Sequence, residues 1–150
     1  MFGTDYREPP FQTIEEKIER LRLSDARVEE LKSMIVEDFT GPYDSDDYYR
    51  SYEIIEVDKI VGFRTAHFVN NWYEALDTKV LHKPITLERF DPENPDKFDE
   101  YLLFDNNYDP PSVIEIDGKY FVDGDGTHRL TIAKVLGGKK AKVVVRRSKK

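Results

Sequence analysis

The segment from residue 113 to residue 145 restricts the possible fold more than any other part of the chain. At its start, Asp117-Gly118 separates two runs rich in β-branched and aromatic residues. An Asp-Gly pair between two such runs favours a two-residue type I′ turn, in which both turn residues need a positive φ angle. Residues 113–116 and 119–122 are therefore predicted to form an antiparallel hairpin.

A helix and a further strand are predicted after this hairpin. Apolar residues between Leu130 and Leu136 follow at helical spacing, and Gly137-Gly138 is typical of a helix end. The helix would be about 10 residues long, which is a common length. Residues 142–145 then form a short apolar strand. A strand, a helix and a second strand in that order predict parallel pairing between the two strands.

The loop that enters this helix has the sequence Gly126-Thr127-His128-Arg129. The first amides of a helix have no acceptor within the helix, and the helix dipole is positive there, so an anion is favoured. A glycine allows close approach to the backbone, and imidazole and guanidinium groups add charged donors. We therefore predict that Gly126 and Thr127 bind a phosphate through their amides, and that His128 and Arg129 bind it through their side chains. His128 is also a candidate acid or base, because the pKa of a histidine lies near neutrality.

Each of these residues also has an interpretation that involves no ligand. Arg129 could form an ion pair with Asp123 or Asp125, and His128 could be a structural donor. Thr127 could cap the helix through its hydroxyl. Asp123 and Asp125 could either cap the helix or hold Mg²⁺ beside bound phosphates, since carboxylate oxygens suit that ion. We favour phosphate binding, because all of these groups occur in one turn.

The same residues resemble the signature of the ParB/sulfiredoxin superfamily, in which a hairpin strand leads through a glycine-containing loop to a GxHR-like turn and a helix. The resemblance extends over about residues 52–146, and residues 52–60 resemble the opening strand of the family. It implies an α+β fold with a small mixed sheet and flanking helices, preceded in this chain by N-terminal helices. The matching positions of the signature are Tyr120-Phe121-Val122, Gly126-Thr127-His128-Arg129, Ala133 and Gly137.

Members of this superfamily bind nucleotide phosphates at the corresponding turn. They include sulfiredoxins and free-serine kinases, which use ATP or another nucleotide, and partition proteins, which bind CTP and DNA. The resemblance implies ATP or another nucleotide with Mg²⁺ as cofactors, and phosphoryl transfer or nucleotide hydrolysis on a small molecule. Such a reaction needs an acidic residue as base, and Glu56 and Asp58 stand at the end of the predicted opening strand.

Departures from the family narrow these expectations. Sulfiredoxins carry a nucleophilic cysteine at the position of Thr127, and this chain has no cysteine, so their repair reaction is excluded. Partition proteins continue into a helix-turn-helix region, whereas only residues 147–150 follow in this chain, so partitioning is disfavoured. The serine kinases have the histidine, threonine and arginine of their turn in a different order, so the resemblance supports kinase activity for this chain only weakly.

Charge and composition bound the location and the partners. No apolar stretch is long enough to span a bilayer and residues 1–10 are too polar for a signal peptide, so a cytoplasmic protein without membrane contact is expected. The net charge of the 150 residues is −7, yet seven basic and no acidic residues lie between Lys139 and Lys150. This basic end is either a solvated terminus or a nucleic-acid contact, as in a DNA- or RNA-binding or nuclease-like module. The residues available for that contact are Lys139, Lys140, Lys142, Arg146 and Arg147.

The first 50 residues are predicted to form a helical extension and a linker, with the ParB/sulfiredoxin-like domain at 51–147 and a basic tail at 148–150. Thr13 and Glu16 form a capping-box pattern before one helix. Ser24 can cap a second helix that ends at Gly41-Pro42 and has Val28, Leu31, Ile35 and Phe39 on one face.

We expect these N-terminal helices to cover the core. The alternative is that they bind a protein partner, as in a non-catalytic interaction protein of a phage or mobile element. The acidic and aromatic residues 43–49 are expected to be the linker.

Two more helices are predicted in the middle of the chain. Residues 71–80 are expected to form one helix, and Asn94-Pro95 is expected to begin the other. His67 and His82 have no neighbouring residues that indicate a site, so they are treated as ordinary loop or helix residues. The side chains predicted to point inward are Trp72, Ala75 and Leu76 in the first helix and Phe98, Tyr101 and Leu102 in the second.

Overall fold

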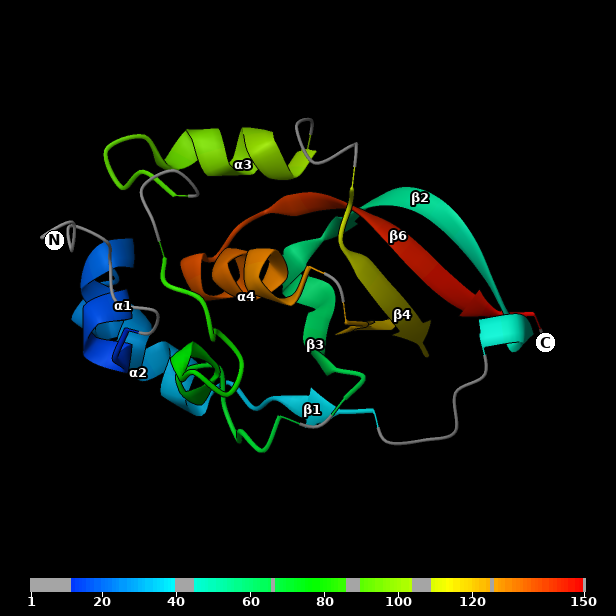
Figure 1. Ribbon diagram of the computed structural model, residues 1–150, viewed down its shortest axis with the longest axis horizontal. Helices are drawn as coiled ribbons and strands as arrows, with labels where there is room; N and C mark the ends of the chain where they lie inside the picture. Colours follow the sequence, from blue (N-terminus) through cyan, green and yellow to red (C-terminus); the bar gives the residue numbers. More distant parts are fainter. Residues whose placement is uncertain are drawn as a thin grey trace, which may run out of the picture.

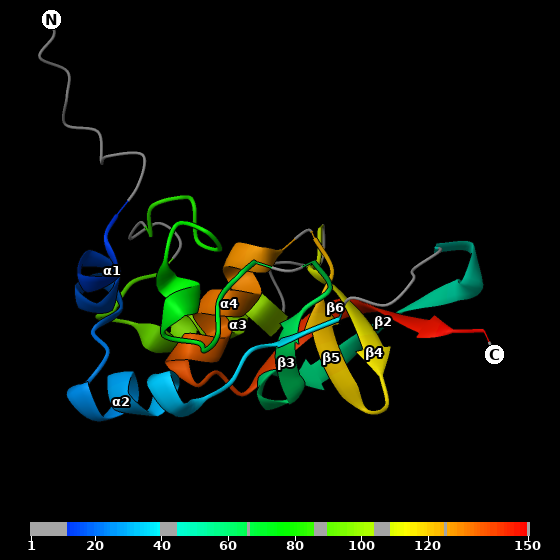
Figure 2. The same ribbon diagram turned by 90° about the horizontal axis from the view of Figure 1, so that it is seen from below.

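The computed structural model describes residues 12–39, 45–65, 67–85, 90–103, 109–124 and 126–149. Its centre is a six-stranded mixed sheet in the order β1-β3-β5-β4-β6-β2. The helices α1 and α2 lie at one end of the molecule, and the end of β6 lies at the other (Figure 1 and Figure 2). The predicted α+β class, with a mixed sheet and flanking helices, is confirmed.

Helices, strands and 3₁₀ turns alternate along the chain. In order, they are α1 (Ile14–Leu21), α2 (Asp25–Ser33), β1 (Glu37–Asp38), η1 (Ser45–Asp47), β2 (Tyr48–Glu56), η2 (Val57–Lys59), β3 (Ile60–Phe63), η3 (Glu74–Leu76), α3 (Pro95–Leu103), β4 (Ser112–Ile116), β5 (Lys119–Val122), α4 (Thr127–Leu136) and β6 (Lys140–Ser148).

The predicted hairpin is formed by β4 and β5. The two strands pair antiparallel, with Val113 opposite Val122 and Ile116 opposite Lys119. Asp117 and Gly118 have φ angles of 52° and 81°, as a type I′ turn requires. Local turn chemistry therefore determines the register of this part of the sheet.

The helix after the hairpin also agrees with the prediction. α4 has 10 residues and ends at Gly137. The amide of Gly138 donates to the carbonyl of Ala133 and the amide of Gly137 to that of Lys134, which is the Schellman arrangement. Arg27 of α2 adds hydrogen bonds to the carbonyls of Lys134 and Val135. These bonds supply donors to the carbonyls of the last turn, which a helix leaves without a partner of its own.

The predicted parallel pairing of the strands on either side of α4 is wrong. β6 pairs parallel with β4 and antiparallel with β2, and it does not pair with β5. Both edges of β5 are already occupied, by β4 on one side and by β3 on the other. The connection through α4 therefore crosses β4, and β6 pairs with the edge of β4 that β5 does not occupy.

The predicted opening strand is divided in two. Residues 52–60 contain most of β2, the 3₁₀ turn η2 and the first residue of β3. β2 begins at Tyr48, so the expected linker of residues 43–49 already contains η1 and the start of a strand. Residues 43 and 44 lie outside the described part of the chain. β2 forms one edge of the sheet, whereas β3 lies next to the other edge.

The N-terminal helices have the predicted caps. Thr13 and Glu16 form the capping box of α1, and the hydroxyl of Ser24 accepts from the amide of Arg27 at the start of α2. The predicted length of the second helix is wrong, because α2 ends at Ser33 and Ile35 is 75% exposed.

Strand pairing replaces the missing turns of that helix. β1 pairs parallel with β3, with Glu37 opposite Gly62. A side chain at Gly62 would place its Cβ 1.4 Å from the carbonyl oxygen of Glu37, so only glycine admits β1 at this distance. The predicted stop at Gly41-Pro42 lies outside the described residues.

Residues 12–39 belong to the same core as the sheet. Leu21, Leu31 and Val36 are buried in the main hydrophobic cluster. The expected role of the N-terminal helices as core cover is confirmed. Ser148, expected in a basic tail, is the last residue of β6.

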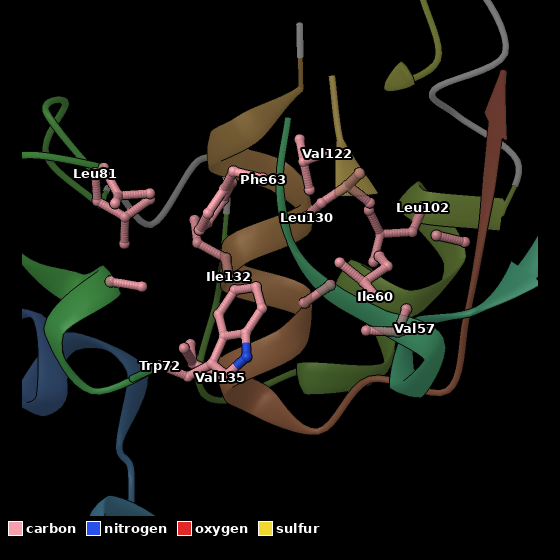
Figure 3. Packing of buried hydrophobic residues seen from close by; sticks show 14 of the residues in the cluster. Val57, Ile60, Phe63, Trp72, Leu81, Leu102, Val122, Leu130, Ile132 and Val135 are labelled. Carbon is pink, nitrogen blue, oxygen red and sulfur yellow. The ribbon is translucent and has the colours of Figure 1, made fainter. Parts of the chain in front are cut away.

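α4 supplies the centre of this core. Figure 3 shows Leu130, Ile132 and Val135 of α4 close to Phe63 and Trp72. The predicted helix at 71–80 is only the 3₁₀ turn η3, although Trp72, Ala75 and Leu76 are buried as expected. α3 begins at Pro95 as predicted; Phe98 and Leu102 are buried, and Tyr101 packs partly buried against them.

Candidate functional site

The predicted phosphate turn lies at the start of α4, where Gly126 is the N-cap residue with a φ angle of 86°. A side chain at Gly126 would bring its Cβ within 2.3 Å of the Cβ of Pro111. The glycine is therefore required by its backbone conformation and by the segment that leads into β4. This packing explains the residue without a ligand.

Thr127 is the first residue of α4 and does not cap it. Its hydroxyl donates to the carbonyl oxygen of Gly124 at 2.6 Å, which closes the loop before the helix. The alternative interpretation of Thr127 as the cap of the helix is therefore wrong. The amide of Leu130 makes the first bond within the helix, to Gly126. The amides of residues 126–129 are therefore the four that the helix itself leaves without an acceptor. Asp125 lies outside the described residues, and its predicted roles stay predictions.

His128 contacts a second histidine from a distant segment. Its Nε2 lies 3.2 Å from Nδ1 of His82. The two rings meet edge to face, with centroids 4.4 Å apart and planes at 77°. His82 comes from the loop after η3 and is exposed, whereas His128 is partly buried. The structure thus adds His82 to the candidate site.

Sequence reasoning missed His82 because nothing around it indicates a site. The two histidines are 46 positions apart, and the loop that carries His82 has no regular pattern. Only the packing of the loop after η3 against the first turn of α4 brings the rings together. A pair of histidines at long separation is the one signal that could have suggested the contact.

Arg129 points to the segment before β4. Its Nη1 donates to the carbonyl oxygen of Asp109 at 2.6 Å. The alternative ion pair with Asp123 is not the observed contact, because other arginines occupy that carboxylate. A guanidinium has five N–H donors, and the bond to Asp109 uses one of them.

Asp123 forms a compact ion cluster next to the turn. Its side chain is 8% exposed and pairs with Arg64 from the end of β3 and with Arg146 of β6, the latter at 2.8 Å. Arg146 also donates to the hydroxyl of Ser112. Both carboxylate oxygens thus face guanidinium groups, which makes Asp123 a bridge between strands. This environment does not fit a Mg²⁺ ligand, and among the described residues no three histidine or acidic side chains are grouped to hold a metal ion.

Glu56 and Asp58 lie at the other end of α4. Both line a cleft of about 380 Å³ together with Gly137 and Gly138, which follow the helix. α4 has 10 residues and is therefore about 15 Å long. The structure does not bring these two carboxylates to the first turn of the helix, so the predicted base at Glu56 or Asp58 is wrong for a site at Gly126–Arg129.

The cleft itself is lined by several cationic side chains. Lys134 is buried beside it and donates from Nζ to the carbonyl oxygen of Asp58 at 3.0 Å. Burial lowers the pKa of Lys134, and the charge of Asp58 opposes that shift. Glu56 pairs with Lys59 at 3.5 Å. The remaining basic residues of the lining are Arg27, Lys139 and Lys140.

The basic end of the chain is partly used within the sheet. Arg147 pairs with Glu53 and Glu115 on neighbouring strands, and Arg146 pairs with Asp123. The hydrogen bond to Glu53 raises the pKa of Arg147, and that to Arg147 lowers the pKa of Glu53. These two arginines therefore hold the sheet together and do not form an open phosphate-binding surface.

Comparison with known proteins identified no relative of this chain. No family model, no curated protein and no solved structure matches the chain. Within the residues that the structure describes, no helix is both long and apolar enough to cross a membrane.

Proposed function

We propose that the first turn of α4 binds the phosphate group of a nucleotide, through the amides of Gly126 and Thr127 and the side chains of His128, Arg129 and His82. The observation that carries the proposal is the contact between His82 and His128, 3.2 Å apart at the start of the helix. Two imidazoles from distant segments add hydrogen-bonding and proton-carrying groups where the helix dipole already favours an anion.

The electrostatics of the histidine pair support this assignment. The contact joins Nε2 of His128 to Nδ1 of His82 at 3.2 Å. A protonated imidazole donates hydrogen bonds from both of its nitrogens, which suits a bound phosphate. Arg129 adds a permanent positive charge one residue away, and a guanidinium can donate two parallel hydrogen bonds to phosphate oxygens.

The same pair could support a reaction. Transfer or hydrolysis of a phosphoryl group requires a proton for the leaving oxygen or the removal of one from the attacking group. His128 with His82 behind it is the group in this turn that can carry such a proton. Glu56 and Asp58 lie at the other end of α4, and Asp123 is paired with two arginines. None of these three carboxylates is therefore assigned a role as base or metal ligand at this turn.

Calorimetric titration with ATP, ADP, CTP, GTP and pyrophosphate, with and without Mg²⁺, tests the proposal. We expect binding of at least one of these compounds and a loss of affinity of about tenfold or more in Arg129→Ala, because a hydrogen bond to a charged group is worth about 1.5–3 kcal/mol. Lys140→Ala is the matched control, since it removes one basic residue at the other end of α4. Absence of binding, or an equal loss in the control, would reject the site.

Histidine NMR gives a second and independent readout. The chain has three histidines, and His67 contacts Phe63 and lies outside the pair. We expect the ring signals of His82 and His128 to shift on addition of the bound nucleotide while those of His67 stay in place. Release of inorganic phosphate, measured in the wild type and in His128→Ala, then shows whether binding leads to hydrolysis.

A further inference from the structure

The edge strand β2 carries a large share of the exposed apolar surface. Of the five large hydrophobic side chains that are exposed among the described residues, Tyr49, Tyr52 and Ile54 lie on β2, at 47%, 67% and 57%. β2 is the last strand of the sheet, and its second edge pairs with no strand in the described part of the chain.

The strand is also long and regular. All nine of its residues pair with β6 without a register shift, and it contains no proline. Native proteins usually shorten, bend or charge such an edge to prevent pairing with other chains. An edge that keeps its length and its apolar side chains is suited to accept another strand.

We propose that β2 pairs antiparallel with β2 of a second copy of this chain, around a twofold axis at Glu53. In that register Tyr52 lies opposite Ile54 of the second copy, and Arg50 lies opposite Glu56. The symmetry repeats each pair, so the interface contains two apolar pairs and two ion pairs on one face of the extended sheet. This self-complementarity is the reason for assigning a second copy as the occupant.

The charges on the strand are consistent with this pairing. Arg50 is exposed and has no ion pair among the residues that the structure describes. Glu56 pairs only at 3.5 Å with the exposed Lys59 and could accept a second cation. The two Glu53 side chains would face each other, but each is held by Arg147 of its own chain, with Oε1 3.0 Å from Nη2. The negative charge of each Glu53 at the axis is therefore already balanced by Arg147 of its own chain.

A charge exchange tests the pairing. Light scattering and sedimentation over roughly a hundredfold range of protein concentration should show a species with twice the 17.6 kDa of one chain. Arg50→Glu and Glu56→Arg, each alone, place like charges opposite each other and should weaken the dimer about tenfold or more. The double variant should restore it, as should a mixture of the two single variants.

Three results would overturn the proposal. They are a monomer at every concentration, a dimer that neither single variant weakens, and a double variant that fails to recover. Circular dichroism and thermal melting of each variant establish that it is folded. All the substituted side chains are exposed, so unchanged melting is expected.

Cysteine pairs test the register directly. Because the chain has no cysteine, introduced thiols react only with each other. Side chains directly opposite in an antiparallel pair have Cβ atoms about 4.5–5.5 Å apart. A mixture of Tyr52→Cys and Ile54→Cys should therefore form a disulfide under mild oxidation, while each variant alone should not. Crosslinking of Tyr52→Cys alone would instead place the axis at Tyr52 and contradict the register.

Discussion

Lys17 donates a hydrogen bond from its Nζ to the carbonyl oxygen of Leu76 at 2.6 Å, inside the core between α1 and η3. A second bond of 2.6 Å reaches the carbonyl of Leu81. The side chain is fully buried, although its position on α1 gives no sign of it. This lysine joins the N-terminal helix to the loop that carries His82, and so helps to place one half of the histidine pair.

The burial of Lys17 predicts a pH dependence of stability. Burial lowers the pKa of its amine below the ordinary 10.5, and the charge of Asp77 only partly opposes the shift. The unfolded chain then binds more protons than the folded one between the lowered pKa and 10.5, so the free energy of unfolding should rise with pH in that interval. The neutral amine still has N–H donors for both carbonyls.

Chemical unfolding of the wild type and of Lys17→Met at several alkaline pH values measures this effect. The difference in unfolding free energy between the two proteins should change in favour of the wild type as the pH increases. A difference that stays constant with pH would contradict the lowered pKa of Lys17.

Gly126→Ala should destabilise the protein strongly. The new methyl group meets the Cβ of Pro111 at 2.3 Å and the residue has a φ angle of 86°. A left-handed conformation alone costs about 1–2 kcal/mol for a residue with a side chain, and the clash adds to that cost. Gly124→Ala is the matched control, because its φ angle is 75° and no atom lies within 4 Å of the added Cβ. Urea unfolding should therefore show the larger loss for Gly126→Ala; equal losses would contradict the contact with Pro111.

Asp123→Asn should cost about 3 kcal/mol, because it leaves the two guanidinium groups of Arg64 and Arg146 without their buried counter-charge. Glu37→Gln removes one carboxylate from an exposed ion pair with Lys119 and should cost under about 1 kcal/mol. Denaturant unfolding of both variants measures the two values. A small effect at Asp123 would show that the cluster does not hold the strands together.

Glu53→Gln should reduce the acid sensitivity of the fold. The hydrogen bond from Arg147 lowers the pKa of Glu53 below 4.5. The ionised carboxylate therefore contributes stability above 4.5, and this contribution is lost as the pH falls through the lowered pKa. The unfolding free energies of the wild type and the variant should converge in acid. Divergence as the pH falls would contradict the direction of the shift.

Features set by neighbouring residues could be predicted from the sequence. Asp117-Gly118 determined the hairpin turn, Thr13 and Glu16 the start of α1, and Gly137 the end of α4. Each of these depends on dihedral preferences or hydrogen bonds within a few residues. The helical spacing of apolar residues likewise indicated the buried faces of α3 and α4.

Features that depend on contacts between distant residues could not be predicted from the sequence. The pairing of β6 with β4 depended on which strand edges were already occupied. Glu56 and Asp58 lie beside the C-terminal end of α4, because β2 ends and η2 begins next to Gly137 and Gly138. The partners of Asp123 are Arg64, which directly follows β3, and Arg146 of β6; they are 59 and 23 positions away.

The sequence by itself determined the hairpin turn between β4 and β5, the starts of α1, α2 and α3, and the end of α4. It also placed a glycine, a histidine and an arginine together at the start of α4. Only the tertiary structure decided that His82 joins them, that Asp123 is held by two arginines, and that β2 remains as an apolar edge. The physical reason is range. Backbone preferences and caps act over a few residues, whereas ion pairs, ring contacts and strand order depend on which distant segments compete for the same space.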